Sequence, residues 1–513
     1  MLNQKSLKPI HPLGESLSTE SSPVAVDTFD GKVHVEWDPQ AAVTPMGQLS
    51  FFIDYLKTAE LFEPWISECP LHYTSNNASS KRDVLGTILL SVLAGHKRYA
   101  HITSIRSDNV NPKLLGMEHV VSEDAVRRAF QKVDTEVCVT WQLHHLKRCW
   151  KPLLCESWIL DIDTTVKPLY GKQEGAVVGY NPHKPGRPCQ VYHTYMMANT
   201  RMILDVEVQP GNQGSSLYSR PQLFAFIDQL SPEEQPAFLR GDSGFGNEGT
   251  IVEAEERQID YLFKLRQTKK VKQLIQALFT QAEWTNAGKN WEGTQSRLTL
   301  SGWSKERRVI VLRRESKGEI LLEKTTQDSQ QTLFYIDPLT PFKKYEYAVL
   351  VTSLSDEILT IAQHYRDRSD SENVFDELKN QWSWGGFMTQ DLHRCQVMAR
   401  HTALIYNWWS LYVRLVIPEK HSEAVTSRPL LLYAVGQQTG HGRQTKLTLT
   451  GMHAHTKQIQ KCFEKLTHFL SRIRATAEQL GWEERWRQIL SRAMRKFLRG
   501  KPLTKPRLVL NTG

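Results

Sequence analysis

The sequence predicts an α/β protein in which a domain of mixed strands and helices is flanked by a helical region at each end. Three observations carry this prediction. Apolar residues recur at helical spacing from Gln48 to Leu154, strand and helix patterns alternate between residues 155 and 268, and helical patterns return from Ile358 onward. A chain of 513 residues has room for two to four domains of ordinary size.

The N-terminal part of the chain divides into a tail and a helical domain. Residues 1–30 are polar and rich in Ser, Thr and Pro, and we expect them to be disordered. Residues 31–154 are expected to form a helical DNA-binding domain, with one short strand at Lys32 to Trp37, where apolar and polar residues alternate.

A basic helix is the feature of this domain that favours DNA binding. Ser122 fits the N-cap position, and Arg127 and Arg128 follow within the next two turns. A helix that carries cations in a small helical domain suits a helix-turn-helix, and a plain helical bundle fits the pattern equally well. Arg127 and Arg128 are therefore candidate contacts to DNA.

The pattern of apolar and polar residues changes after Leu154. The expected elements, in chain order, are strands at 157–166, 190–198 and 202–209, a helix at 221–230, a strand at 236–240, a helix at 248–257 and a strand at 260–265. This order, β-β-β-α-β-α-β, matches the topology of the RNase H-like fold. We expect residues 155–268 to form the first part of an RNase H-like catalytic domain.

Residues 269–344 do not continue this alternation. Three alternating segments, at 296–300, 308–312 and 332–336, predict a mainly β insertion. The catalytic domain is expected to resume over 345–412, with a strand at Tyr345 to Ser353 and one long helix from Ile358 to Gln381. Residues 413–513 are expected to form a helical C-terminal region that ends in a basic tail.

Three carboxylates fall where the predicted fold would bring them together. Asp163 lies on the first strand, Asp242 ends the fourth, and Glu372 lies on the helix after the insertion. The first and fourth strands of an RNase H-like sheet are neighbours. Cleavage of a phosphodiester with two divalent ions needs such a set of oxygen ligands, because Mg²⁺ prefers oxygen. Asp163, Asp242 and Glu372 are therefore the candidate catalytic and metal-binding residues.

Two other acids compete for these roles. Asp161 lies on the same face of its strand as Asp163, since side chains alternate with a period of two, and periodicity does not separate the two. Asp376 lies one turn after Glu372 on the same helix. A strand acid that pairs with a nearby Lys or Arg is the alternative interpretation of Asp161 and Asp163.

The predicted long helix carries a polar stripe. Tyr365, Arg368, Glu372 and Lys379 fall within about 60° of one another around the helix at about 100° per residue. A tyrosine, two cations and an acid suit a metal ligand flanked by contacts to phosphates. An ion-paired surface helix would show a similar pattern.

The stripe also resembles a known family. Tyr365-x2-Arg368-x3-Glu372-x6-Lys379 reproduces the YREK signature of bacterial insertion-sequence transposases with a DDE active site. Upstream, Asp163-Thr164-Thr165 and Gly241-Asp242-Ser243-Gly244-Phe245 resemble the first and second acidic motifs of that family, in the right order. The resemblance covers about Trp158 to Trp409.

This resemblance implies a cut-and-paste transposase with an RNase H-like catalytic domain. Asp163, Asp242 and Glu372 would hold two Mg²⁺ ions, with Mn²⁺ as a substitute, and Tyr365, Arg368 and Lys379 would bind phosphates near the scissile bond. The implied reactions are cleavage at transposon ends, formation of a DNA hairpin and strand transfer into target DNA.

The resemblance also implies a base-stacking tryptophan at the start of the strand before the Glu helix. Ala348 stands at the nearest equivalent position, so Tyr345 and Tyr347 are possible substitutes, with Tyr347 our candidate DNA contact. Tyrosines that pack the edge of the sheet are the alternative.

The implied partners are double-stranded DNA, at transposon ends and at the target, and a second copy of the chain in a homodimer on DNA. Residues 427–490 are our candidate dimer region. A non-catalytic DNA-binding regulator derived from a transposase and a metal-dependent DNA nuclease are the competing functions.

Charge and hydropathy agree with a nucleic-acid partner. The net charge is +9 with a pI near 9.0, and residues 491–513 hold seven Lys or Arg and no acid, as in a solvated tail or a phosphate-contacting arm. No run reaches the roughly 18–20 apolar residues of a membrane span, and the first residues lack the apolar stretch of a signal peptide. We expect no membrane association and a cytoplasmic, nucleoid-associated protein of a bacterium.

Overall fold

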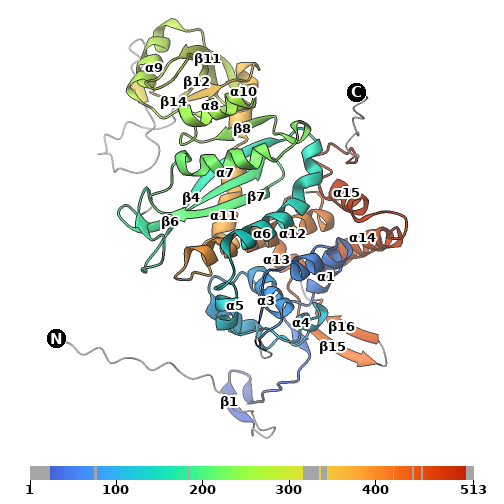
Figure 1. Ribbon diagram of the computed structural model, residues 1–513. Helices are drawn as coiled ribbons and strands as arrows, with labels where there is room; N and C mark the ends of the chain where they lie inside the picture. Colours follow the sequence, from blue (N-terminus) through green and yellow to red (C-terminus); the bar gives the residue numbers. More distant parts are fainter. Residues whose placement is uncertain are drawn as a thin grey trace, which may run out of the picture.

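A large mixed β-sheet with helices on both of its faces organises the molecule (Figure 1). The computed structural model describes residues 23–73, 75, 78–182, 184–315, 334–336, 344–419, 421–441, 444–451 and 454–503. The α/β class expected from the sequence is confirmed, with eleven strands in this one sheet.

Five strands form the centre of the sheet, in the order β7-β6-β4-β8-β9. Their bounds are Ile159–Pro168 for β4, Pro188–Met197 for β6, Met202–Pro210 for β7, Phe238–Gly241 for β8 and Asp260–Lys264 for β9. Neighbours among β4, β6 and β7 pair antiparallel, and β4, β8 and β9 run parallel.

The connections explain these directions. β6 and β7 are joined by a tight turn in which Asn199 and Arg201 have φ of 62° and 57°. Parallel neighbours need a crossover, which α7 (Ser216–Asp228) and α8 (Glu248–Glu256) supply on either side of β8. The two-residue strand β5 (Val177–Val178) pairs with β6.

The strands of the expected insertion extend this sheet and do not form a separate one. β14 (Lys344–Thr352) pairs with β9 and also with β12 (Arg307–Glu315), which continues to β11 (Trp291–Leu298) and β10 (Thr285–Gly288). β13 (Phe334–Ile336) pairs with β14. The expected strand at 332–336 lies only partly within the described residues.

The insertion also contains a helix that we did not expect. α9 (Lys269–Gln281) opens it, with Val271 and Ile275 buried one turn apart against the main core. This apolar stripe stands among Lys and Gln residues, and its helical period was missed because the surrounding segments alternate as strands do.

The expected long helix is two helices. α10 (Ile358–Arg366) and α11 (Ser369–Gln381) meet at Asp367 and Arg368, where Arg368 N–H donates to the carbonyl of Tyr365, three residues earlier (3.2 Å). A single tightened turn of this kind changes the helical spacing of the side chains very little, so the periodicity of the sequence does not reveal the break between the two helices.

Helix α12 (Leu392–Val416) is buried on nearly all sides and contacts β7 and the N-terminal helices (Figure 1). Arg400 donates to both oxygens of Asp205 on β7 at 2.8 and 3.1 Å. Asn407 bonds the backbone N–H and carbonyl of Ile203 at 2.9 and 2.8 Å. These polar contacts fix α12 on the sheet.

Most of the N-terminal region is helical, as expected. Its helices are α1 (Leu49–Thr58), α2 (Phe62–Ser67), α3 (Lys81–Leu93), α4 (Asn111–Leu114), α5 (Glu123–Ala129) and α6 (Thr135–Trp150), with 3₁₀ turns η1 (Tyr99–Ile105), η2 (Lys151–Cys155) and, further on, η3 (Pro232–Glu234). The side chain of Ser122 caps α5 by accepting from Ala125 N–H at 3.2 Å.

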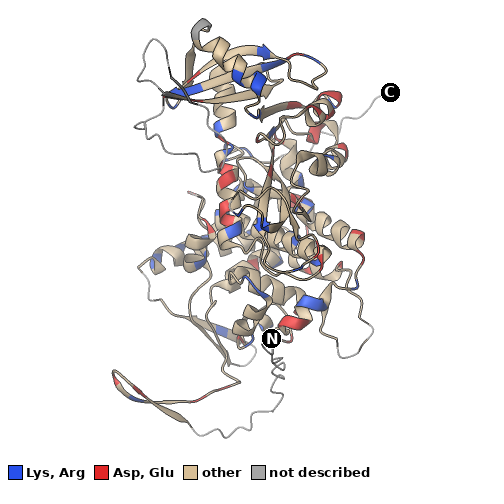
Figure 2. Ribbon diagram, turned by 90° about the vertical axis from the view of Figure 1, so that its left-hand side faces the viewer, with Lys and Arg blue, Asp and Glu red and all other residues tan. Residues whose placement is uncertain are grey.

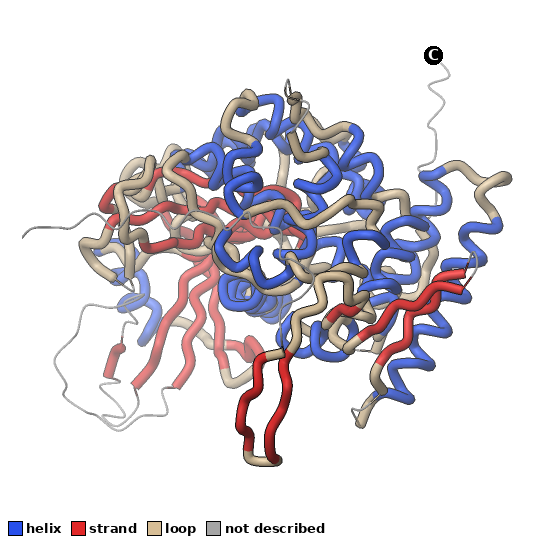
Figure 3. The backbone as a smooth tube through the Cα atoms, turned by 90° about the horizontal axis from the view of Figure 1, so that it is seen from below, coloured by secondary structure: helices blue, strands red, loops and turns tan. Residues whose placement is uncertain are grey.

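Two hairpins complete the strands, and the one strand among them that was expected, at Lys32 to Trp37, is confirmed as β2 with slightly earlier bounds. Val24–Thr28 (β1), within the segment expected to be disordered, pairs with Gly31–Val35 (β2), and the exposed hairpin projects from the molecule (Figures 1 and 3). In the C-terminal region, β15 (Gly436–His441) and β16 (Gln444–Leu449) form a second hairpin, to which β3 (Val43–Thr44) adds. β15 and β3 are nearly 400 residues apart in the sequence, so local sequence patterns do not predict that they pair.

The rest of the C-terminal region is helical, in α13 (Ala424–Leu431), α14 (Thr456–Ala475) and α15 (Trp482–Ala493). Among the described residues, no helix combines the length and the apolarity needed to cross a membrane.

We expect Asp205→Ala to destabilise the fold by about 3–5 kcal/mol, because it leaves Arg400 buried without a counter-charge. Asp228→Ala is the matched control, because Asp228 pairs with Arg257 at the surface and such pairs contribute at most about 1 kcal/mol. Thermal and urea unfolding of both variants measures the difference. Equal losses would show that the Asp205–Arg400 pair does not fix α12.

Candidate active site

One face of the sheet changes from apolar to charged as the strands approach their carboxyl ends. Beneath α10 this face is apolar, and the residues are Ile159, Phe238, Leu262, Ile310 and Leu350. Two residues further along β4, β8 and β9, the same face carries Asp161, Arg240 and Lys264, because alternate residues of a strand share a face. The apolar layer seats α10, and the polar layer lies where α10 passes into α11.

The first polar layer is a buried ion pair between neighbouring strands. Asp161 on β4 and Arg240 on β8 are register partners, and Arg240 donates to both oxygens of Asp161 at 2.5 and 2.7 Å. Arg240 also donates to the carbonyl of His364 on α10, and Ser371 on α11 donates to Asp161. This pair therefore ties both helices to the sheet.

These contacts separate the two candidate acids of β4. Both oxygens of Asp161 are taken up by Arg240 and Ser371, and the residue is 2% exposed. Asp163 lies one step nearer the end of the strand, with its side chain 17% exposed. The geometry gives Asp161 a structural role and leaves Asp163 at the opening of the site.

Arg368 lies between two of the three candidate catalytic acids. Its guanidinium donates to Asp163 Oδ2 and to Glu372 Oε1, at 2.6 Å in each case, through different nitrogens. Arg368 is 6% exposed, whereas the side chain of Glu372 is 60% exposed. The arginine is therefore anchored in the protein, and Glu372 faces solvent.

The loop after β8 fixes the third acid. Asp242 follows Gly241, and its Oδ1 accepts from Gly244 N–H at 2.8 Å. Gly246 lets the loop approach β9 closely, because a Cβ there would lie 2.5 Å from the carbonyl oxygen of Lys264. The Gly-Asp-Ser-Gly-Phe segment is thus a tight turn that holds Asp242 at the end of its strand.

The three carboxylates influence one another electrostatically. Burial raises the pKa of Asp163, Arg368 opposes that rise, and the negative charges of Asp242 and Glu372 add to it, with a net pKa of about 6. Burial disfavours the charge of Arg368, but Asp163, Asp242 and Glu372 outweigh it, so that the pKa of Arg368 is raised. The site is a negative cluster held together by one guanidinium.

The other members of the predicted stripe surround this cluster. Burial raises the pKa of Tyr365, with contributions from Asp242, Glu372 and Asp163. Desolvation lowers the pKa of Lys379, and the negative charge of Asp163 opposes that change. Tyr365, Arg368 and Glu372 line a cavity of about 610 Å³ with Trp291 of β11.

Lys264 at the end of β9 is a residue that the sequence did not single out. Burial lowers its pKa, as does the positive charge of Arg368, while Asp242 and Glu372 favour its charged form. It also lines the cavity. Lys264 ends β9, and β9 is the neighbour of β8, which Asp242 follows. The sequence alone does not show that these two strands are neighbours, so it does not indicate that Lys264 lies near Asp242.

Tyr347 is placed differently from our expectation. It is 3% exposed and packs in the main core with Trp284, at 6.4 Å between ring centroids. Ala348, the next residue, belongs to the smaller core on the α10 side. The period of two along β14 thus turns the Tyr347 ring to the other face, and Tyr345 shares that parity. The interpretation of Tyr347 as a packing residue fits the structure better.

The two candidate cations of α5 lie in the N-terminal helical region. Arg127 and Arg128 both pair with Asp124, at 2.6 and 3.2 Å, and their side chains are 41% and 64% exposed. The carbonyl of Arg127 accepts from Arg394 of α12. Asp376, the rival of Glu372, is exposed and accepts from Asn380, and its charge favours the charged form of Lys379.

The residues present fit a hard divalent cation. Asp163, Asp242 and Glu372 offer carboxylate oxygens, which are the ligands that Mg²⁺ and Mn²⁺ prefer, and burial together with the charges of the other two acids raises the pKa of Asp163. In this structure Arg368 bridges Asp163 and Glu372, so part of that charge is balanced by the guanidinium. A bound cation would compete with Arg368 for these carboxylates.

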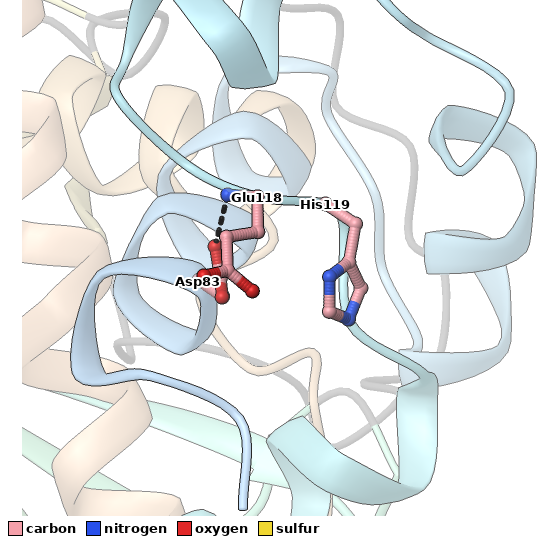
Figure 4. A group of neighbouring side chains, drawn as sticks. All are labelled: Asp83, Glu118 and His119. Atoms are coloured by element: carbon pink, nitrogen blue, oxygen red, sulfur yellow. Dashed lines mark hydrogen bonds between the residues drawn. The ribbon is translucent and has the colours of Figure 1, made fainter.

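A different group has its ligand atoms closer together. Asp83, Glu118 and His119 lie within 4.8 Å of one another in the N-terminal region (Figure 4). Asp83, however, accepts from Ser80 and from Glu118 N–H, both at 2.8 Å, and Ser80 caps α3. These contacts explain Asp83 as part of a helix cap.

Comparison with known proteins identifies the family. Residues 71–471 match the family described as transposase DDE domain group 1, which is more than half of the chain, and the chain belongs to this family. The match reaches further toward the N-terminus than the resemblance of the motifs. No curated protein matches the sequence. Among solved structures, a piggyBac transposase synaptic complex with hairpin DNA matches at 11% identity and a TM-score of 0.35, over 88% of this chain and 87% of that chain.

The raised pKa of Asp163 predicts a pH-dependent effect on stability. An ordinary Asp titrates near 3.8, and Asp163 titrates near 6 in the folded protein, so the folded state binds this proton more tightly. The stabilisation from the proton is complete below about pH 4 and is lost as the pH rises through about 6. Without metal, Asp163→Asn should therefore raise the thermal midpoint at pH 7.5 and change it little at pH 4.

The control for this measurement is Asp376→Asn, which removes an exposed carboxylate from α11. Its midpoint should follow the unmodified protein at both pH values. An Asp163→Asn midpoint at pH 7.5 equal to or below that of the unmodified protein would contradict the electrostatic description of the site.

Proposed function

We propose that this protein is a DNA transposase that cleaves transposon ends and joins them to target DNA at the cluster of Asp163, Asp242 and Glu372. The observation that carries the proposal is the convergence of these three acids on Arg368 within a chain of the DDE transposase family. The strand order β7-β6-β4-β8-β9, with β4, β8 and β9 parallel, supports an RNase H-like catalytic domain formed by residues 155–268 and 345–412.

Members of this family generally use divalent metal ions. We propose two Mg²⁺ ions, replaceable by Mn²⁺, with Asp163, Asp242 and Glu372 as the protein ligands. Such ions would activate the attacking oxygen and stabilise the leaving oxygen of the phosphodiester. The chain contributes the carboxylates on two neighbouring strands and one helix, so that their spacing is set by the sheet.

The cations around the acids would hold the DNA backbone. Arg368 can offer two parallel N–H donors to a phosphate once it releases a carboxylate, because its guanidinium is planar. Lys379, on α11, and Lys264, at the end of β9, would add positive charge on either side. Tyr365 lines the cavity and would donate its hydroxyl hydrogen to a phosphate oxygen.

The proposed reaction has three stages at this one site. Water attacks the phosphodiester at the transposon end and releases a 3′-hydroxyl. In the second stage that hydroxyl attacks a phosphodiester of the opposite strand, which forms a hairpin and releases the flanking DNA with a 3′-hydroxyl, and hydrolysis then reopens the hairpin. The 3′-hydroxyl of the transposon end then attacks a target phosphodiester. For a displaced base during hairpin formation, Trp291 is a better candidate than Tyr347, because both line the cavity but Trp291 is half-buried whereas Tyr347 is buried.

Other parts of the chain would organise the DNA. We propose that residues 31–154 bind the transposon end, with Arg127 and Arg128 as contacts, and that the chain acts as a homodimer on DNA. A transposase of this kind would work in the bacterial cytoplasm on nucleoid DNA.

We expect Asp163→Ala, Asp242→Ala and Glu372→Ala each to abolish cleavage of a plasmid bearing the element's ends with Mg²⁺, while binding to those ends survives. Asp161→Ala should behave differently, because removal of one partner of a buried pair costs about 3–5 kcal/mol of folding stability. Gel assays of cleavage and joining, with thermal unfolding, separate the two classes of variant.

The outcomes also separate the competing functions. Cleavage without joining would identify a nuclease, and end binding without cleavage a regulator. A stable, active Asp163→Ala together with a stable, inactive Asp161→Ala would exchange the roles of the two acids.

A further inference from the structure

The positive charge of this protein is concentrated at its C-terminal end. Residues 456–513 contain fourteen Lys or Arg and four Glu, a net charge of +10, whereas the whole chain carries +9. The first 455 residues therefore carry a net charge of −1. On the side of the molecule opposite α14 and α15, acidic and basic residues are interspersed (Figure 2).

Helices α14 and α15 present these cations to solvent because their apolar stripes face inward. Ile459, Phe463 and Leu466 of α14 are buried, as are Trp486 and Ile489 of α15. Among the described residues of this segment, the exposed cations other than Arg474 are Lys457, Lys461, Lys465, Arg472, Arg495, Lys496, Arg499 and Lys501. We call them, together with Arg492, the C-terminal basic surface.

Only part of the positive charge is balanced within the protein. Arg474 pairs with Asp54 and Arg485 with Glu60, which tie the two helices to the N-terminal region. Within the described residues, Arg495, Arg499 and Lys501 form no ion pair with a carboxylate. These three cations lie just after α15, in the turn at residues 494–500 and at the residue that follows it.

A cavity of about 580 Å³ lies between α15 and this turn. Arg492, Arg495 and Lys501 line it together with Arg487 and a single acid, Glu484. The Arg492 guanidinium is half-buried and lies 4.2 Å from the centre of the Phe469 ring. Burial lowers the pKa of Arg492, and the nearby positive charge of Arg472 lowers it further. An anion placed here would relieve the repulsion between these cations.

The side chains of the C-terminal basic surface indicate which kind of polyanion it binds. Among the described residues, no large hydrophobic side chain of α14 or α15 is exposed, so the surface lacks the apolar face that inserts into a membrane. It also lacks exposed aromatic rings for stacking unpaired bases. A rigid, cationic surface without either feature fits the phosphates of a double helix.

We propose that the C-terminal basic surface binds duplex DNA through its phosphates, without reading its sequence. The choice of DNA over double-stranded RNA rests on the proposed function. α14 and α15 lie on one side of the molecule, away from β11, β12 and β14, whose residues line the cavity beside Arg368 and Glu372 (Figure 1).

The test is the salt dependence of binding to a duplex that lacks the transposon ends. The variant Arg495→Gln/Arg499→Gln/Lys501→Gln removes three cations, and Lys57→Gln/Lys113→Gln/Lys172→Gln removes three exposed cations elsewhere. Because each cation of the basic surface is expected to bind one phosphate, the slope of log K against log salt should fall by about 2–3 in the first variant and stay unchanged in the second. Thermal unfolding verifies that both variants are folded.

Equal slopes in the two variants would overturn the proposal. Tighter binding to RNA of the same length than to the duplex DNA, whether the RNA is single-stranded or double-stranded, would also overturn it. A third contrary result concerns phosphatidylserine vesicles: the unmodified protein binds them, the first variant does not, and the salt slope of the first variant for DNA is unchanged. Cleavage of the end-bearing plasmid reports separately on the proposed function. Active cleavage with equal slopes refutes the surface alone, and absent cleavage with the expected slope change refutes the catalytic function alone.

Discussion

The buried ion pair between Asp161 and Arg240 is the constraint on which the site depends. It joins two neighbouring parallel strands, and its remaining hydrogen bonds, to His364 and Ser371, hold α10 and α11 on the same face. A buried pair of this kind adds little net stability compared with apolar residues, but it fixes geometry, since breaking any one of these bonds would leave a buried polar group without a partner. It therefore sets the position of the next layer of side chains, which is the acidic cluster.

In that next layer, a single guanidinium balances charges that would otherwise repel. Arg368 contacts Asp163 and Glu372, and Asp242 lies within electrostatic reach of both. Burial raises the pKa of Asp163 and the charges of Asp242 and Glu372 add to that rise, so the one arginine offsets these effects only in part. The same imbalance favours a divalent cation, and the released arginine would then be available to a phosphate. The C-terminal basic surface shows the opposite imbalance, with cations gathered around one acid.

Sequence patterns predicted the features that depend on local period. The strands of the central sheet and the positions of Asp163, Asp242 and Glu372 followed from alternation and from the motifs around them. Sequence patterns did not predict the features that tertiary contacts determine. The pairing of β15 with β3 joins distant segments, and the role of Asp161 depended on Arg240 being its register partner. Burial on β14 likewise follows from tertiary packing, because the ring of Tyr347 packs in the main core whereas the adjacent Ala348 belongs to the core on the α10 side.

The central claim is that Asp163, Asp242 and Glu372 form the metal site and that Asp161 supports it. Anomalous X-ray scattering from crystals of the protein with duplex DNA and Mn²⁺ locates bound ions directly. The predicted result is Mn²⁺ peaks within coordination distance of Asp163, Asp242 and Glu372, with Asp161 still paired to Arg240 and Arg368 withdrawn from at least one carboxylate. Ions bound at Asp161, or only at Asp83, Glu118 and His119, would contradict the claim.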